Sequence, residues 1–231
     1  MLERELQWEL DLFACLNGSN SAFWDSFFYL YSYQWTWIPF YLCLLFVFIY
    51  RKTGAEIKKD RKEILGTIVS VILVIALCDQ ISSGICKPLF HRFRPTHHPD
   101  FQDWVNTVLD YRGGLYGFAS GHAANTFGLA TFTALLFRNR LATFTLLLFA
   151  LITGYSRIYL GVHFISDVVA GALIGIVMGY AVFLLYHKII KPSGCVPPPW
   201  KIRLLSAVYS VSVIILCFFS VFFRHYLCFL S

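Results

Sequence analysis

Three short groups of polar residues in the central part of the sequence combine cations, histidines and a carboxylate. Read in order, they are Lys87-Pro-Leu-Phe-His-Arg-Phe-Arg94-Pro95, Ser120-Gly121-His122 and Ser156-Arg157-x5-His163-x3-Asp167. Cationic side chains bind phosphoryl oxygens, and arginine does so through two parallel hydrogen bonds. We therefore expect three cations to bind the oxygens of one phosphoryl group: Lys87, Arg94 and Arg157.

The second group stands directly before a long apolar run, at the predicted start of a helix. Free backbone N–H groups and the helix dipole favour an anion at such a position. Because glycine has no Cβ atom, Gly121 lets the backbone approach a phosphate closely. Ser120 and Gly121 are therefore predicted to bind phosphate, and Ser120 can cap the helix as well.

The histidines supply the groups that a covalent phosphoryl transfer needs. His163 and Asp167 are four residues apart, so on a helix they share one face. A carboxylate there can accept a hydrogen bond from one ring nitrogen, which leaves the other nitrogen free as a nucleophile. His122 then remains to donate a proton to the leaving oxygen.

Apolar runs long enough to cross a membrane fill most of the sequence. The chain of 231 residues is 58% hydrophobic and 14% charged, whereas soluble domains average about 45–50% apolar and about 25% charged residues. A spanning helix needs about 20 mostly apolar residues. We predict an all-α, polytopic membrane helix bundle that forms one domain over residues 1–231. About six transmembrane helices are expected, at Ser26–Tyr50, Ile64–Cys86, Ala119–Phe137, Leu141–Tyr155, Val168–Tyr186 and Leu204–Phe223.

The distribution of charge predicts an N-terminal element and an orientation. The first 16 residues carry four acidic residues among apolar ones, and residues 1–25 are expected to form an amphipathic helix at the membrane interface. Most of the 19 Lys and Arg residues flank spans on one side, which the positive-inside rule makes cytoplasmic. The three polar groups then face the periplasm or the cell exterior, with the protein in a bacterial cytoplasmic (inner) membrane. Because these charges flank spans, we expect no nucleic-acid partner.

The longest loop, Lys87–Phe118, contains further polar residues. Its adjacent His97 and His98 have no further metal-ligand pattern. With Arg92, Asp103 and Arg112 they are expected to form a lid or a headgroup selector. In the preceding span, Asp79 is followed by Ser83 and Lys87 at four-residue intervals, which predicts an inward polar stripe that stabilises Lys87. The seven cysteines contain no Cys-x-x-Cys pair, so neither a metal site nor a disulfide framework is expected.

Taken in order, the motifs K-x6-R-P, S-G-H and S-R-x5-H-x3-D resemble the signature of the type 2 phosphatidic acid phosphatase (PAP2)/vanadium haloperoxidase superfamily. The match runs from Lys87 to Asp167. The resemblance implies a helical core and hydrolysis through a phosphohistidine without a metal or other cofactor. It implies His163 as nucleophile, Asp167 as its orienter and His122 as acid. It also implies a set of phosphate-binding residues: Lys87, Arg94, Ser120, Gly121 and Arg157. The family's second motif usually begins with proline, where this chain has Ala119.

The expected activity is that of an integral membrane lipid phosphatase. Its substrate would be a membrane phospholipid, a polyprenyl phosphate or a lipid A phosphate, with undecaprenyl diphosphate, phosphatidylglycerophosphate and lipid A phosphate as candidates. The same phosphohistidine could instead transfer its phosphate to a lipid or sugar hydroxyl, which would make the protein a phosphotransferase. A non-catalytic lipid-phosphate flippase would need the cations but not the His163–Asp167 pair. The oligomeric state is left open by the sequence.

Overall fold

The computed structural model describes residues 7–18, 21–49, 57–192 and 196–230, with side chains described except at 57–60 and 223–230. These residues form helices and turns, and the one pairing of extended backbone among them is an isolated bridge between Phe93 and Tyr116. The all-α fold class is therefore confirmed. The main helices are α1 Gln7–Leu16, α2 Ala22–Ser32, α3 Ile38–Ile49, α4 Ile57–Asp79, α6 Gly121–Phe137, α7 Arg140–Tyr159, α8 Ile165–Ile190 and α9 Pro199–Leu230.

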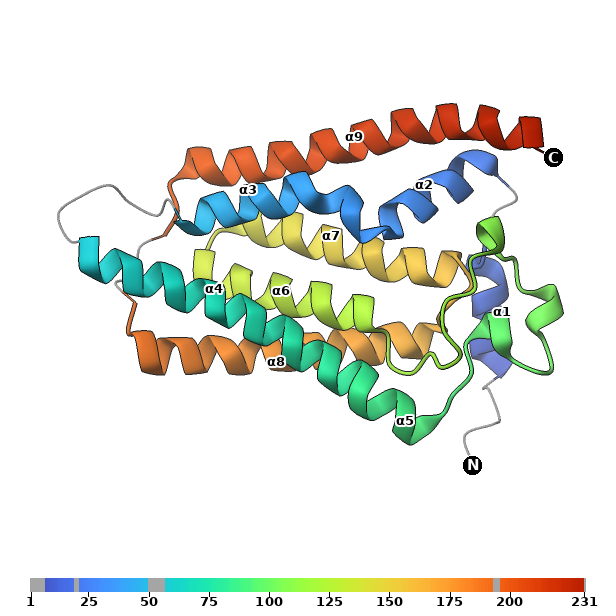
Figure 1. Ribbon diagram of the computed structural model, residues 1–231, viewed down its shortest axis with the longest axis horizontal. Helices are drawn as coiled ribbons and strands as arrows, with labels where there is room; N and C mark the ends of the chain where they lie inside the picture. The colour runs from blue at the N-terminus through green and yellow to red at the C-terminus, as the bar shows by residue number, and fades with distance from the viewer. Residues whose placement is uncertain (1–6, 19–20, 50–56, 193–195, 231) are drawn as a thin grey trace.

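Short helical turns complete the chain: η1 Gln34–Trp37, the π-helical η2 Gln80–Cys86, α5 Lys87–Phe90, η3 Pro95–His97, η4 Gln102–Trp104 and η5 Val108–Asp110. Figure 1 shows α6 in the middle of the bundle, with α4 and α8 on one side and α7, α3 and α9 on the other. Helix α1 and the long loop before α6 cover one end.

Among the described helices, four are long and apolar enough to cross a membrane: Arg61–Phe90, Arg140–Tyr159, Ile165–Ile190 and Pro199–Phe222. A fifth span results if α2 and the segment Gln34–Ile49, which are bent by 71° at their junction, count as one. The expected span at Ser26–Tyr50 is thus not a straight helix. The span expected at Ala119–Phe137 is α6, whose 17 residues reach only about 25 Å at about 1.5 Å per residue. The predicted count of six is therefore not confirmed.

Close contact between α6 and α8 joins two of the three polar groups. Glycines at every fourth position of α8 face α6: Gly171, Gly175 and Gly179. A Cβ atom on any of them would lie 2.4 or 2.5 Å from a backbone carbonyl oxygen in or just before α6, so only glycine allows this approach. Where the two helices begin, the Ser120 N–H donates to the Asp167 carbonyl at 2.9 Å. The starts of α6 and α8 are therefore held together.

The basic flanks and the polar groups lie at opposite ends of the bundle. Helix α4 begins, α6 ends, α7 begins, α8 ends and α9 begins at one end, while α1, the long loop and the starts of α6 and α8 lie at the other (Figure 1). The described basic residues of the first end are Arg61, Lys62, Arg138, Arg140, Lys188, Lys191, Lys201 and Arg203. The separation of charges predicted from the sequence is present in the fold.

Helix α1 packs against the protein with one face. Glu9 and Phe13 are buried, and the Phe13 ring contacts Phe164 with ring centroids 5.4 Å apart. The neighbouring Trp8 and Leu12 side chains are exposed. Residues 7–16 of the N-terminal region are thus helical, whereas the amphipathic, interfacial character expected for residues 1–25 is not confirmed, and residues 1–6 and 19–20 lie outside the described part.

Candidate active site

His163 and Asp167 form a buried pair at the start of α8. The His163 Nδ1 atom lies 3.3 Å from Asp167 Oδ2, and the two residues are 1% and 0% exposed. The same carboxylate oxygen accepts the Phe164 N–H at 3.1 Å. The sequence predicted the partners, but not the local geometry: His163 precedes the helix instead of sharing its face. Asp167 reaches back over the helix N-terminus, where a carboxylate is favoured by the free N–H groups and the dipole.

Gly117 approaches this pair from the long loop. A Cβ atom at Gly117 would lie 2.8 Å from Asp167 Oδ2, so the close approach requires glycine. The Gly117 backbone also hydrogen-bonds the His163 ring. Burial first, and then the nearby charges of Arg94, Arg157 and Lys87, hold the pKa of His163 well below its ordinary value. The ring is therefore neutral at physiological pH, as a nucleophile must be.

Two arginines act on the His163 ring electrostatically, and each keeps a donor group that has no partner among the described residues. Arg157 is 2% exposed, donates from Nη2 to the Tyr111 hydroxyl at 3.0 Å and from Nη1 to Ser32 Oγ. Arg94 is 8% exposed and donates from Nε to the Tyr116 carbonyl at 3.2 Å. Burial and the charge of Arg157 lower the pKa of Arg94 to about 10, which still leaves it charged at neutral pH.

Three buried polar atoms of the predicted phosphate-binding residues have no hydrogen-bond partner among the described residues: Arg94 Nη1, Arg157 Nε and Ser120 Oγ. Buried polar groups are almost always paired in folded proteins, so such atoms require an explanation. Ser120 is the residue before α6, but its hydroxyl makes no capping bond. A bound anion with several oxygens would satisfy all three groups.

Lys87 approaches from the end of the π-helical segment η2, a rare conformation that is frequent at functional sites. Its ammonium donates to Ser83 Oγ at 2.9 Å, and Asp79 acts on it electrostatically. The stripe that the sequence predicted through these residues is therefore present at Ser83. A Cβ atom at Gly121 would lie 3.5 Å from Ser83 Oγ, so the start of α6 lies against η2.

His122 occupies the first turn of α6 and is half-buried. Four charged or titratable side chains act on it electrostatically: Arg157, His163, Arg94 and Lys87. They belong to the first and third polar groups, whereas His122 belongs to the second. The eight site residues predicted from the sequence thus lie together at one end of the bundle.

Several residues of this site were not predicted from the sequence. Arg92, expected in a lid, has a side chain only 12% exposed and donates from Nη1 to Asp167 Oδ1 at 2.8 Å. The backbone at His91 is left-handed, with φ of 48°, and this turn after α5 directs the chain inward. Tyr111 and Glu9 also reach the site. Tyr111 and Glu9 show no spacing pattern relative to the motifs, and nothing in the sequence indicates that Arg92, although it lies within the first polar group, binds Asp167.

The paired histidines of the loop pack within the loop itself. His98 stacks on Phe101 with ring centroids 3.7 Å apart, and His97 Nδ1 lies 3.1 Å from Thr96 Oγ1. Thr96 in turn donates to the Arg112 carbonyl at 2.9 Å. These contacts bind the loop together beside the site, and the lid or selector function of the loop stays a prediction.

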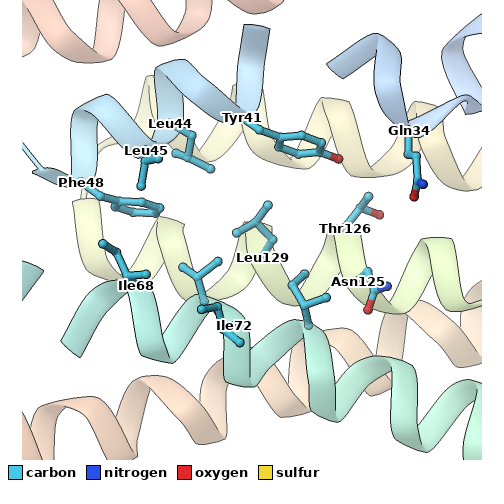
Figure 2. A pocket seen from close by; sticks show the side chains of 12 residues that line it. Gln34, Tyr41, Leu44, Leu45, Phe48, Ile68, Ile72, Asn125, Thr126 and Leu129 are labelled. Atoms are coloured by element: carbon cyan, nitrogen blue, oxygen red, sulfur yellow. The ribbon is translucent and has the colours of Figure 1, made fainter. Parts of the chain in front are cut away.

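A cavity of about 380 Å³ opens between α3, α4 and α6, next to the site. Apolar side chains line most of it, and Figure 2 shows Phe48, Leu45 and Ile68 toward one end and Gln34, Asn125 and Thr126 toward the other. The polar end lies one helical turn along α6 from His122, because Thr126 lines the cavity and donates from Oγ1 to the His122 carbonyl at 2.8 Å. The cavity can therefore hold an apolar chain whose polar end lies near His122.

Comparison with known proteins identifies the family of the chain. The model of the PAP2 superfamily matches residues 65–191. The chain is 45% identical over 185 residues to the lipid A 4'-phosphatase of Porphyromonas gingivalis, covering 80% of this chain and 75% of that protein. It is 35% identical over 182 residues to the lipid A 4'-phosphatase of Bacteroides thetaiotaomicron, covering 78% of each. The crystal structure of Aquifex aeolicus LpxE matches with a TM-score of 0.53 and 30% identity, over 80% of this chain and 99% of that one. The chain therefore belongs to the PAP2 superfamily and is one of its phosphatases.

Proposed function

We propose that the protein is a membrane lipid phosphatase. It hydrolyses a phosphate monoester of a lipid A-type substrate and releases inorganic phosphate without a metal ion. The observation that carries the proposal is the neutral, buried His163 beside three cations, with donor groups of Arg94, Arg157 and Ser120 left unpaired among the described residues. The activity of the two similar relatives, lipid A 4'-phosphatase, supports the substrate class.

The first chemical step forms a phosphohistidine. The His163 ring nitrogen opposite Nδ1 attacks phosphorus, and the bond between phosphorus and the lipid oxygen breaks. A protonated His122 gives its proton to that oxygen. Burial first, and then the four charged or titratable neighbours, disfavour the protonation of His122, and a phosphate dianion bound among the cations favours it. The cations and the start of α6 stabilise the charge on the equatorial oxygens, which is the main catalytic contribution in phosphoryl transfer.

The second step releases inorganic phosphate. A water molecule attacks the phosphorus of the phosphohistidine, the N–P bond breaks, and the water proton passes to the now neutral His122. The lipid alcohol and inorganic phosphate are the products, and His163 returns to its neutral form. Asp167 holds the Nδ1–H of His163 throughout.

The position of the site supports a lipid substrate that enters from the bilayer. The cavity between α3, α4 and α6 is apolar along most of its length and has its polar end beside His122. The basic residues at the opposite end of the bundle favour a cytoplasmic location for that end. We therefore assign the site to the periplasmic or outer side of a bacterial cytoplasmic membrane.

Phosphate release by the detergent-purified protein tests the proposal. The assay contains EDTA and compares lipid A, undecaprenyl diphosphate, phosphatidylglycerophosphate and phosphatidic acid. We expect release from lipid A, with a product lighter by one phosphate, and no effect of EDTA. Release from undecaprenyl diphosphate alone would overturn the substrate class. Phosphate transfer to an added hydroxyl lipid without free phosphate would replace hydrolysis by phosphotransfer.

Blocking the cavity should weaken lipid binding without affecting the chemistry. Leu45 lines the cavity, whereas Leu42 on the same helix is 60% exposed and does not. A Leu45→Trp side chain that displaces about two methylene groups costs about 1.6 kcal/mol, roughly a tenfold rise in KM for the lipid. The kcat for a short-chain phosphate ester should stay unchanged. Leu42→Trp is the matched control, and equal KM values for the two variants would contradict an acyl chain in the cavity.

A further inference from the structure

We propose that Glu9 and Arg92 are positioning residues for Asp167, so that helix α1 sets the orientation of the His163 ring. This inference rests on the proposed phosphohistidine chemistry. Glu9 belongs to the N-terminal helix, which lies outside the three polar groups and outside the residues 65–191 that match the family model, whereas Arg92 lies within the first polar group.

A single guanidinium joins the two carboxylates. Arg92 donates from Nη1 to Asp167 Oδ1 at 2.8 Å and from Nη2 to Glu9 Oε2 at 2.9 Å. The guanidinium also stacks over the Phe164 ring, with its carbon 4.4 Å from the ring centroid. The Glu9 and Asp167 side chains are 4% and 0% exposed. Charges buried in this way interact strongly and tolerate little movement.

Glu9 holds the start of α8 with its second oxygen. Its Oε1 atom accepts the Ser166 N–H at 2.8 Å, and this backbone group belongs to the same helical turn as Asp167. Both oxygens of Glu9 are therefore committed to elements that support the catalytic carboxylate. Phe13, one turn further along α1, packs against Phe164 and keeps α1 in register.

The two carboxylate oxygens of Asp167 have different partners. Oδ2 faces His163 Nδ1, and Oδ1 faces Arg92. Because Glu9 shares the charge of Arg92, Asp167 keeps enough negative charge to accept strongly from the His163 ring. Without the Glu9 charge, Arg92 would be neutralised by Asp167 alone, and the hydrogen bond to His163 would weaken.

Arg92 differs in this respect from the arginines that we assign to phosphate binding. Both of its Nη atoms donate to carboxylates, whereas Arg94 Nη1 and Arg157 Nε have no partner among the described residues. Arg92 therefore acts on the reaction through Asp167, and its loss should lower kcat more than it raises KM.

The test compares Glu9→Gln and Arg92→Lys with Asp11→Asn, a matched change at an exposed acidic residue of α1. We expect Glu9→Gln to lower kcat about tenfold to hundredfold, the range seen when the second partner of a metal-bound histidine is lost, with KM changed less than threefold. Asp11→Asn should leave both constants unchanged. In the Arg92→Lys background, Glu9→Gln should cost much less than it does alone, since the two residues act as one unit.

A second readout separates positioning from a general loss of structure. The His163 Nδ1–H proton, followed by NMR in 15N-histidine-labelled protein, should shift in Glu9→Gln and stay in place in Asp11→Asn. Full kcat in Glu9→Gln, additive losses in the double variant, or an unmoved proton would each overturn the proposal. If the unaltered protein releases no phosphate from any lipid, the proposed function fails, while the proton shift still decides on the positioning residues.

Discussion

Replacing His163 by alanine should lower kcat for phosphate release by about 10⁴-fold or more, the scale seen when a catalytic nucleophile is removed. The physical reason is the loss of the step that forms the covalent intermediate in the proposed mechanism. His163 is 1% exposed and tied to Asp167 and Gly117, so neither water nor another side chain can take its position readily. Binding of the phosphate by Arg94 and Arg157 should survive, because their contacts do not involve the ring.

The measurement combines steady-state turnover with trapping of the intermediate. Substrate labelled with 32P is mixed with the protein, quenched in alkali and separated by electrophoresis, since a phosphohistidine survives base and not acid. Label should appear in the unaltered protein and be absent in His163→Ala. His187→Ala, at the opposite end of α8, is the matched control and should keep both label and turnover. Turnover that persists in His163→Ala would contradict the mechanism.

Replacing His122 by alanine should slow lipid phosphate hydrolysis by about 10²–10⁴-fold, the usual contribution of a general acid or base. The size of the effect should depend on the leaving group. A lipid or sugar alkoxide needs a proton as it departs, because its alcohol has a high pKa. A phenolate whose phenol has a low pKa can leave without one. The formation of the phosphohistidine from an aryl phosphate should therefore be nearly normal in the variant.

Rapid mixing with a chromogenic aryl phosphate checks this expectation. His122→Ala should release a burst of phenolate close to one equivalent per protein and then turn over slowly, because His122 also removes the proton from the attacking water. The burst should vanish in the double variant with His163→Ala. If the variant were slowed equally with aryl and alkyl substrates in the first step, His122 would not be the acid.

Residue types and short-range spacing in the sequence are enough to indicate the chemistry of the site. Side-chain types indicate phosphate binding by Lys87, Arg94 and Arg157, and the four-residue spacing of His163 and Asp167 indicates that they are partners. Composition indicates the helical membrane class, and the segregation of basic residues agrees with the observed arrangement of helix ends. These inferences depend on local patterns, which a sequence displays directly. The helical class and the family are confirmed, and phosphate binding by these residues stays a prediction.

The remaining features of the site and the fold depend on tertiary contacts. Glu9 and Arg92 are 83 residues apart, and their ion pair depends on how α1 docks beside the turn after α5. The 71° bend between α2 and the segment Gln34–Ile49 is a change of chain direction, which hydropathy does not report. The His163–Asp167 pair closes around a helix N-terminus because Gly117 and the glycine stripe of α8 let neighbouring backbone come close. Contacts between distant segments decide such geometry, and no periodicity of a single segment encodes them.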